Sequence, residues 1–320
     1  MPGGALASRG MTPPLMAKSP TPQSHGFGRY APSPSGRLHV GNLRTALLAW
    51  LIAHHTGREL LLRFEDLDAD RCSPETATGQ EQDLSSLGIT WPQEPVFQSL
   101  RTDLYQEAIG TLRASGLDLY PCWCTRADLA LAAPHDPQRP YPGTCRKLSE
   151  AERKERLEDD GRKPALRVDL GDVEIEWDDM ILGPQVGRSS DPIIQRADGA
   201  FTYNLAVVVD DSSQRVDQIV RGDDLASSVP VQAALYDALA SPRPTWCHVP
   251  LVLDPSGSRL SKRVGSTTLE SWGQDGTALA QLGASLGLCN KTEQAITSDQ
   301  LLERFDLGSI NREPWTFESE

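Results

Sequence analysis

Residues 27–55 read FGRYAPSPSGRLHVGNLRTALLAWLIAHH and combine a short strand, a tight turn and a helix. The strand is expected at 27–31, and the turn after it is rich in proline and serine. An amphipathic run from Leu43 to His55 predicts the helix. The first N–H groups of a helix lack partners within it and lie at the positive end of its dipole. This N-terminus is therefore a predicted binding site for phosphate.

Two motifs extend this prediction. The sequence HVGN occupies residues 39–42 at the helix N-terminus, and RLSKR occupies residues 259–263. His39 can donate a hydrogen bond to a phosphate, and Gly41 lets a nucleotide approach the backbone closely. Lys262, in a loop flanked by glycine and serine, can close over the same phosphates. Each motif alone is common by chance, but in this order and context they predict one nucleotide site.

Strands alternate with helices along most of the chain, which is typical of a parallel sheet with crossover helices. The expected strands are 27–31, 60–64, 118–121, 165–169, 193–196, 218–221 and 248–253, and the expected helices are one from 41 to about 55, 75–87, 101–115, 149–160, one after Tyr203, 226–240 and 277–286. The predicted fold class is α/β, with a Rossmann-like nucleotide-binding sheet split by an insertion. The two halves of the sheet carry the two motifs.

Shifts in composition divide the chain into five predicted parts. The first residues are rich in Pro, Gly, Ser and Thr, which indicates disorder. A cysteine cluster and a proline-rich loop mark the insertion, whose charged helix at 149–160 is expected to be mainly a solvated face. The parts are a disordered extension (1–25), the first half of the nucleotide-binding domain (26–121), an insertion with the cysteine cluster (122–175), the second half of that domain with the lysine loop (176–270) and a short helical C-terminal element (271–320).

Composition excludes several classes of protein. The chain has 320 residues and a net charge of −13, which argues against gripping nucleic acid over the whole surface. Any RNA contact must use a local basic patch. The longest apolar run, from Ala46 to Ala53, is too short for a membrane span, and the N-terminus does not resemble a signal peptide. The six cysteines do not indicate a disulfide scaffold, so the expected compartment is the cytoplasm.

Three of the cysteines form a candidate metal site. Cys122 and Cys124 are followed by Cys145, and the three thiols can converge on one ion if the intervening loop folds back. Zinc prefers four tetrahedral ligands drawn from S, N and O. The residues alone leave the fourth ligand open. The alternative is that these are reduced cysteines packed as small apolar side chains.

Other polar and sulfur-containing residues have simpler explanations. Asp66, Asp68 and Asp70 could suggest a metal cluster, but a capped turn before the helix at 75–87 explains them more simply. The remaining cysteines are isolated and are expected to be buried structural thiols; they are Cys72, Cys247 and Cys289.

Four further segments carry a family resemblance: GRYAPSPSG at 28–36, RFEDLD at 63–68, TYNLAVVVDD at 202–211 and IVRGDD at 219–224. With HVGN and RLSKR as degenerate forms of the HIGH and KMSKS signatures, the chain resembles the glutamyl branch of the class I aminoacyl-tRNA synthetases. From about Gly26 onward it is most similar to the glutamyl-Q tRNA(Asp) synthetases. One departure is Asn42 in place of the last histidine of HIGH, which would leave more of the phosphate binding to backbone donors.

The resemblance implies a reaction and its partners. The enzyme would activate L-glutamate with ATP and Mg²⁺, without requiring tRNA, and transfer it to queuosine at the wobble position of tRNA(Asp). A monomer and no membrane contact are expected. Since the carboxylate of glutamate is already a nucleophile, catalysis depends on positioning and charge stabilisation. Lys262 and His39 are the predicted catalytic residues. The predicted ATP-binding residues are His39, Gly41, Asn42 and Lys262.

The resemblance also assigns the glutamate pocket. Arg29 can pair the side-chain carboxylate in a two-pronged geometry, and Glu65 can balance the α-ammonium. Two alternatives stay open: Arg63 and Glu65 could form a structural pair, and Arg221 could belong to a surface ion pair. The predicted glutamate-binding residues are Arg29, Tyr30, Ala31, Pro32, Ser33, Glu65, Tyr203 and Arg221.

The family pattern Cys-x-Cys followed by Tyr-x-x-x-Cys maps onto Cys122, Cys124, Tyr141 and Cys145. It favours Tyr141 as the fourth ligand over His135, a chemically more usual ligand in the loop between. A closed site of this kind would be structural, with one zinc.

Other functions remain open from the sequence. The short segment after the lysine loop predicts no anticodon-binding domain, yet a shortened glutamyl-tRNA synthetase that charges the tRNA 3′ end is the main rival. A catalytically inactive RNA-binding paralogue is a second rival, although it would not need residues that activate glutamate. A small-molecule nucleotidyltransferase is a more distant alternative.

Overall fold

A computed structural model describes residues 26–125, 127–129, 141–159, 161–260, 268–272, 277–290, 293 and 296–318. The predicted disordered extension at 1–25 lies outside these residues. The helices are α1 (Val40–His55), α2 (Pro74–Ser86), α3 (Thr102–Ala114), α5 (Glu150–Asp159), α6 (Tyr203–Ser213), α7 (Val229–Ala238), α8 (Leu269–Trp272), α9 (Thr277–Ser285) and α10 (Ser298–Glu303), with 3₁₀ turns η1 (Gln98–Leu100) and η2 (Asp223–Ser228).

The main sheet has seven strands in the order β3-β2-β1-β9-β10-β6-β7. All neighbours in it are parallel except β6 and β7, which form an antiparallel hairpin. Its strands are β1 (Phe27–Tyr30), β2 (Leu60–Phe64), β3 (Val96–Phe97), β6 (Glu174–Asp179), β7 (Gly183–Arg188), β9 (Val216–Gly222) and β10 (Thr245–Val249). The predicted parallel sheet with crossover helices is thus confirmed.

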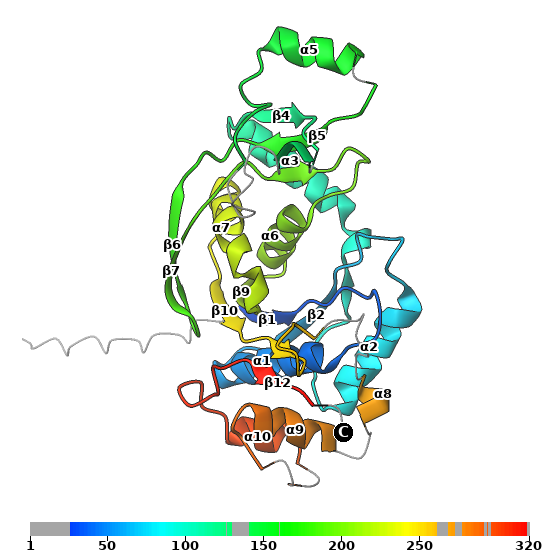
Figure 1. Cartoon of the computed structure of the whole chain (residues 1–320), viewed down its shortest axis with the longest axis vertical. Coiled ribbons are helices and arrows are strands. Elements are labelled where there is room, and N and C mark those ends of the chain that lie inside the picture. The colour runs from blue at the N-terminus through cyan, green and yellow to red at the C-terminus, as the bar shows by residue number, and fades with distance from the viewer. Residues whose placement is uncertain are drawn as a thin grey trace, which may run out of the picture.

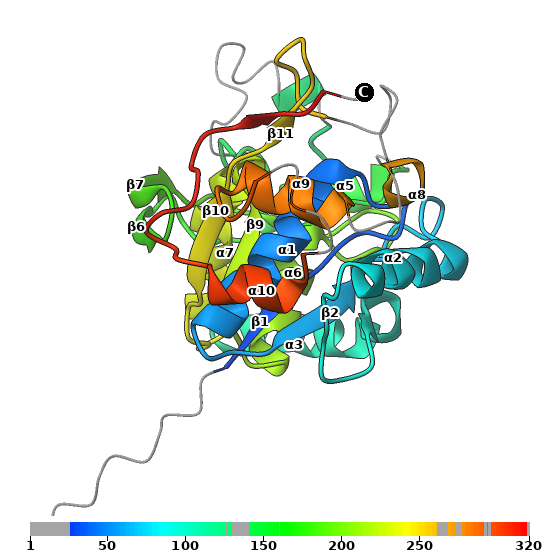
Figure 2. The same ribbon diagram turned by 90° about the horizontal axis from the view of Figure 1, so that it is seen from below.

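Helices cover both faces of this sheet. Helix α1 lies on one face, and α6 and α7 lie on the other (Figure 1). Every residue of α1 from Ala46 to Ala53 is buried, because α9 and α10 pack on the side of α1 that faces away from the sheet (Figure 2). A helix that is apolar all round is stable only when it is enclosed in this way. The C-terminal segment therefore completes the core around α1.

A second sheet stands at the far end of the molecule from α9 and α10 (Figure 1). Its three antiparallel strands are β4 (Leu119–Cys122), β5 (Ala165–Val168) and β8 (Ile193–Gln195). This sheet extends beyond the predicted insertion at 122–175 on both sides, because β4 and β8 belong to it. Among the described residues of the predicted insertion, only the start of β6 belongs to the main sheet. Helix α5 is exposed at most positions, as predicted for a solvated face.

Several predicted boundaries were wrong. Helix α1 begins at Val40, one residue before the predicted start at 41, because His39 caps it. The strand expected at 248–253 is divided by Pro250 into β10 and β11 (Val252–Leu253), since proline cannot donate to a sheet hydrogen bond. The helix expected at 226–240 starts as the 3₁₀ turn η2. The β6–β7 hairpin was not predicted.

The C-terminal segment returns to the catalytic domain. Strand β12 (Trp315–Thr316) pairs in parallel with β11. In the sequence, β11 follows β10, a strand of the main sheet. Together with α9 and α10, β12 forms more than the purely helical element that was predicted. Within the described ranges, the helices lack the combination of length and apolar character that a membrane span requires.

Candidate active site

A cavity of about 590 Å³ lies where β1 and β9 end and α1 begins. Ligands of open α/β sheets bind at this position, outside the carboxyl ends of the strands. Its walls contain all of the predicted glutamate- and ATP-binding residues that the structure describes: Arg29, Tyr30, Ala31, Pro32, Ser33, His39, Gly41, Asn42, Glu65, Tyr203 and Arg221. Residues far apart in the sequence therefore share one site.

His39 is the N-cap of α1, and this role determines its tautomer. Its Nδ1 accepts a hydrogen bond from the Gly41 N–H at 3.1 Å, so the neutral ring carries its proton on Nε2. The side chain of Asn42 reaches back to the N–H of His39. The Gly41 N–H is thus satisfied by the His39 ring; that backbone donors compensate for Asn42 in phosphate binding stays a prediction. A Cβ at Gly41 would lie 3.0 Å from the His39 ring, so this position favours glycine.

The described residues on either side of 261–267, in the lysine loop, lie beside the same cavity. Leu260 lines the cavity, and Thr268 pairs with His39 in an isolated antiparallel bridge. Lys262 itself lies outside the described residues. Arg259, the first residue of RLSKR, forms an ion pair with Asp224, and both residues line the cavity.

Arg29 is held rigidly at the base of the cavity. Its side chain is 4% exposed, its Nη1 donates to the Val220 carbonyl at 3.2 Å, and its Nε lies 3.6 Å from Asp211 Oδ1. The carbonyl belongs to β9, and Asp211 belongs to α6. The neighbouring strand and the covering helix thus orient this arginine together.

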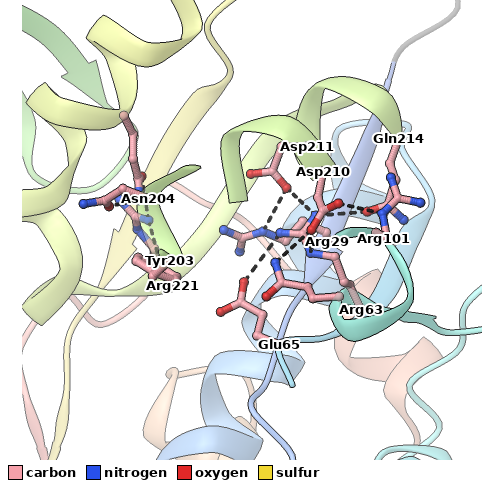
Figure 3. Close-up of polar contacts among 12 residues, drawn as sticks. Arg29, Arg63, Glu65, Arg101, Tyr203, Asn204, Asp210, Asp211, Gln214 and Arg221 are labelled. Atoms are coloured by element: carbon pink, nitrogen blue, oxygen red, sulfur yellow. Dashed lines mark hydrogen bonds and ion pairs between the residues drawn. The ribbon is translucent and has the colours of Figure 1, made fainter. Parts of the chain in front are cut away.

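A buried charge cluster surrounds Arg29 (Figure 3). Arg63 is fully buried and donates to Asp211 Oδ1 at 2.7 Å, and it lies 3.6 Å from Glu65 Oε1. The predicted alternative of an Arg63–Glu65 pair is therefore present in the structure. Burial raises the pKa of the Glu65 carboxyl, while Arg63 and Arg29 oppose that rise. The Arg63 pKa is raised because its acidic neighbours outweigh the effect of burial.

Arg221 is buried, so the alternative of a surface ion pair is wrong. Its Nη1 donates to the Tyr203 hydroxyl at 3.1 Å and to Gln232 Oε1 at 2.9 Å, and its Nη2 donates to the Leu225 carbonyl. Its Nε donates to Nε2 of His248 at 3.1 Å. Figure 3 shows Arg221 beside Tyr203 and Asn204. The guanidinium is thus oriented from several sides.

The predicted cysteine cluster does form. The thiol sulfurs of Cys122, Cys124 and Cys145 lie within 4.8 Å of one another, with Cys124 and Cys145 3.6 Å apart. The Tyr141 hydroxyl lies 3.6 Å from the Cys122 sulfur and 3.7 Å from the Cys124 sulfur. Tetrahedral zinc with Zn–S bonds of about 2.3 Å separates its ligand atoms by about 3.8 Å. The cluster is therefore compatible with zinc; His135 lies outside the described residues.

Arg167 accompanies this cluster and was not predicted. Its Nε donates to the Cys122 sulfur at 3.2 Å, and its guanidinium carbon lies 3.8 Å from the centre of the Tyr141 ring. Its Nη1 donates to the Asp191 carbonyl. A buried cation thus contacts two of the candidate ligands. Although burial raises the pKa of the Cys122 thiol, hydrogen bonds from Arg167 and Tyr141 bring it below its ordinary value.

Comparison with known proteins identifies the family. Residues 27–320 match the family "tRNA synthetases class I (E and Q), catalytic domain". A glutamyl-Q tRNA(Asp) synthetase of Nocardia farcinica is 47% identical over 306 residues, 94% of this chain and 96% of that protein. The chain belongs to the glutamyl-Q tRNA(Asp) synthetase family. Class I aminoacyl-tRNA synthetases are ATP-dependent ligases, so the chain is an ATP-dependent ligase. Membership of the family implies that glutamate, ATP and a tRNA are its reactants.

Related synthetases share the fold. A glutamate–tRNA ligase of Azospirillum brasilense is 38% identical over 302 residues, 91% of this chain but 67% of that protein. The crystal structure of a glutamate–tRNA synthetase from Elizabethkingia anophelis is similar with a TM-score of 0.76 at 25% identity, covering 92% of this chain and 68% of that chain. Membership of the glutamyl-Q tRNA(Asp) synthetase family thus agrees with both sequence and fold.

Some residues of this family member's site were not predicted. Gln80 lines the cavity and donates from Nε2 to the carbonyls of Ser33 and Gly36, which holds the turn before α1. Arg71 also lines the cavity. His248, which contacts Arg221, was overlooked because an isolated histidine in a strand has no local signature.

Two expectations about other residues were wrong in detail. The N-cap of α2 is Ser73, and Asp66 instead accepts hydrogen bonds from the backbone N–H and the hydroxyl of Ser99. Of the three isolated cysteines, Cys247 is buried as expected, but Cys72 and Cys289 are only partly buried.

Proposed function

We propose that this enzyme joins the α-carboxylate of L-glutamate to the α-phosphorus of ATP, and then transfers the glutamyl group to queuosine at the wobble position of tRNA(Asp). The observation that carries the proposal is the shared cavity. It is lined by the predicted glutamate residues and by His39, Gly41 and Asn42, and the described residues flanking the lysine loop lie beside it. A module that only bound RNA would not need this combination.

The charges in the cavity suit glutamate. Arg29 and Arg221 are buried cations that would meet its carboxylates, and a planar guanidinium matches a carboxylate better than an ammonium does. Glu65 would balance the α-ammonium. Although burial raises the Glu65 pKa, Arg63 and Arg29 favour its charged form. The Tyr203 hydroxyl accepts from Arg221, so its own proton is available for the substrate.

Activation requires no protein base. A carboxylate oxygen of glutamate attacks the α-phosphorus while the bond from that phosphorus to the α,β-bridging oxygen breaks, which releases pyrophosphate. The ring proton on Nε2 makes His39 a hydrogen-bond donor to the nucleotide. Lys262 would stabilise negative charge on the phosphates in the transition state. Mg²⁺ would accompany ATP and would be held mainly by its phosphates and by water.

The comparisons favour queuosine in tRNA(Asp) as the acceptor. The chain matches glutamyl-Q tRNA(Asp) synthetases over most of their length, whereas it matches about two thirds of the glutamate–tRNA ligase. The names of the first group specify glutamyl-Q and tRNA(Asp). A shortened glutamyl-tRNA synthetase that charges the 3′ end is the competing function.

We also propose one structural zinc, held by Cys122, Cys124, Cys145 and the Tyr141 oxygen. The Tyr141 hydroxyl accepts from the N–H of Cys145 at 2.8 Å, which aims its oxygen at the cluster. The ion would fix the predicted insertion at 122–175, which would meet the RNA at the end of the molecule distant from α9 and α10.

The test maps where labelled glutamate is attached. The protein is incubated with ATP, labelled glutamate and total tRNA, and the tRNA is then digested with nuclease. We expect label in the anticodon-loop fragment of tRNA(Asp), and only in tRNA that already contains queuosine. Pyrophosphate exchange with glutamate should proceed without tRNA. Label on the terminal adenosine of tRNA(Glu), together with tRNA-dependent exchange, would establish the competing function.

A further inference from the structure

Three buried side chains from neighbouring strands form a hydrogen-bonded chain next to the cavity. Asp179 on β6 contacts His248 on β10, and His248 contacts Arg221 on β9. The Asp179 carboxylate and the His248 imidazole are both fully buried. Of the three, only Arg221 lines the cavity.

The sheet register creates this contact. Residues Arg221 and His248 lie directly opposite each other in the parallel pairing of β9 with β10. Asp179 pairs with Trp246 at the end of β6. The β6–β7 hairpin thus delivers a carboxylate to His248 from the side opposite Arg221.

The hydrogen bonds define how His248 is protonated. Asp179 Oδ1 accepts from the backbone N–H groups of Ile181, Leu182 and His248, each at 3.0 or 3.1 Å. This leaves Oδ2 to accept from His248 Nδ1 at 2.5 Å. Nδ1 therefore carries the proton, and Nε2 presents its lone pair to the Nε–H of Arg221. A proton on Nε2 would oppose that donor.

The charges agree with a neutral ring. Burial lowers the pKa of His248, and Arg221 and Arg29 lower it further, while Asp179 opposes the shift. The pKa of Asp179 is lowered overall, because hydrogen bonds from His248 and three backbone groups outweigh the effect of burial. An ionised Asp179 and a neutral His248 are therefore the stable pair.

We propose that His248 and Asp179 are positioning residues that hold the Arg221 guanidinium in the orientation that binds a carboxylate of glutamate. This inference rests on the proposed function, since it requires Arg221 to bind glutamate. Tyr203 and Gln232 restrain one end of the guanidinium, and His248 restrains the Nε edge. The Leu225 carbonyl restrains Nη2, so after loss of the Nε contact the guanidinium plane is held only at its Nη groups and its orientation is less well defined.

Two substitutions at one position separate positioning from general stability. The amide oxygen of His248→Gln can occupy the place of Nε2 and accept from Arg221, whereas the shorter amide of His248→Asn can keep the Asp179 contact only. His248→Asn should raise the KM for glutamate about ten- to hundredfold, as expected for a lost hydrogen bond to a charged group. His248→Gln should stay near the parent, and the KM for ATP should change little in both.

Asp179→Asn provides an independent variant. Its amide oxygen must face the three backbone N–H groups, so its NH₂ group must face His248 Nδ1. That arrangement moves the ring proton from Nδ1 to Nε2. The Nε2 proton then faces the Nε–H of Arg221, and the two donors repel each other. The KM for glutamate should rise as in His248→Asn. Combined with Arg221→Gln, His248→Asn should have no further effect on that KM, because coupled residues are not additive.

The measurement is glutamate-dependent pyrophosphate exchange, with thermal unfolding to establish that each variant is folded. Three outcomes would overturn the positioning role. His248→Gln and His248→Asn could raise the KM for glutamate equally, or the KM values for glutamate and ATP could rise equally. The third outcome is an additive effect of His248→Asn and Arg221→Gln on the KM for glutamate. If His248→Asn does not fold, parental KM values in a folded Asp179→Asn protein would overturn that role as well. The parent serves as the reference: if it shows no glutamate-dependent exchange, the proposed function itself fails.

Discussion

The backbones of His39 and Thr268 pair as an isolated antiparallel bridge at the cavity wall. His39 caps α1, and Thr268 is the first described residue after the lysine loop. The two signature motifs, which lie at opposite ends of the catalytic domain sequence, are thereby joined. This bridge supports a shared role in phosphate binding.

Lys262→Ala should lower the rate of glutamate activation by about 10² to 10³, as expected when a transition-state donor is removed. The thermal midpoint should change little. Lys154→Ala, on the exposed face of α5, is the matched control. Unchanged exchange kinetics in Lys262→Ala would remove the lysine loop from the mechanism.

Arg29→Lys should lower kcat/KM for glutamate about tenfold or more while the KM for ATP changes little. Lysine keeps the charge but cannot reproduce the planar fork that matches a carboxylate. Arg243→Lys is the control, because Arg243 pairs with Asp237 at the surface. Equal rises in both Michaelis constants would instead indicate general damage to the site.

Freshly purified protein should contain about one zinc per chain, and Cys145→Ser should contain much less. Its unfolding midpoint should fall as well, because metal binding is linked to folding. Cys289→Ser, at a thiol distant from the cluster in sequence, should keep its zinc. Elemental analysis that finds no zinc in the parent would disprove the site, and Tyr141→Phe compared with His135→Ala would identify the fourth ligand.

Arg167→Met should weaken zinc binding about 10- to 100-fold, the usual effect of losing a group that supports metal ligands. The cation donates to the Cys122 sulfur and stacks on Tyr141, so it offsets the negative charge of thiolate ligands. Competition with a chromogenic chelator measures the affinity. The control Arg156→Met removes a cation near the Trp123 ring and should leave the zinc affinity unchanged. Equal zinc affinities in the parent and in Arg167→Met would contradict the supporting role of Arg167.

Stability should decrease as the pH falls below about 6.5, and His248 should contribute to that slope. Burial lowers its pKa in the folded protein, so the unfolded chain binds the proton first. The contribution is complete above the ordinary pKa and declines as the pH falls towards the folded value.

Burial also lowers the pKa of His54, so His54 contributes to the pH dependence of stability in the same range. Comparison of the parent with His248→Asn therefore isolates the contribution of His248. The charged groups near His248 are Asp179 on β6, Arg221 on β9, Arg29 on β1 and Asp223 in η2. Chemical unfolding at several pH values gives the slope. An identical slope in the variant would show that His248 does not titrate in this range.

Local patterns predicted many of the elements well. The strand at 60–64 and the helices near 75–87 and 101–115 agree with β2, α2 and α3 to within a residue or so, since apolar periodicity and turn residues act locally. The β6–β7 hairpin escaped prediction although β6 alternates charged residues with Ile175 and Trp177, because β7 contains two glycines and a proline, which are depleted in strands. Cavity residues were predicted where a motif marked them.

The chemical groups of the site could be predicted from the sequence: a helix N-terminus for phosphate, a lysine loop, Arg29 and Arg221 for glutamate and a cysteine cluster. Their partners became visible only in the folded chain. It placed Asp179 against His248 and Arg221, Arg167 against Cys122, and β4 in a sheet apart from β1. The physical reason is that such contacts join residues distant in sequence through sheet register and packing, which no local spacing encodes.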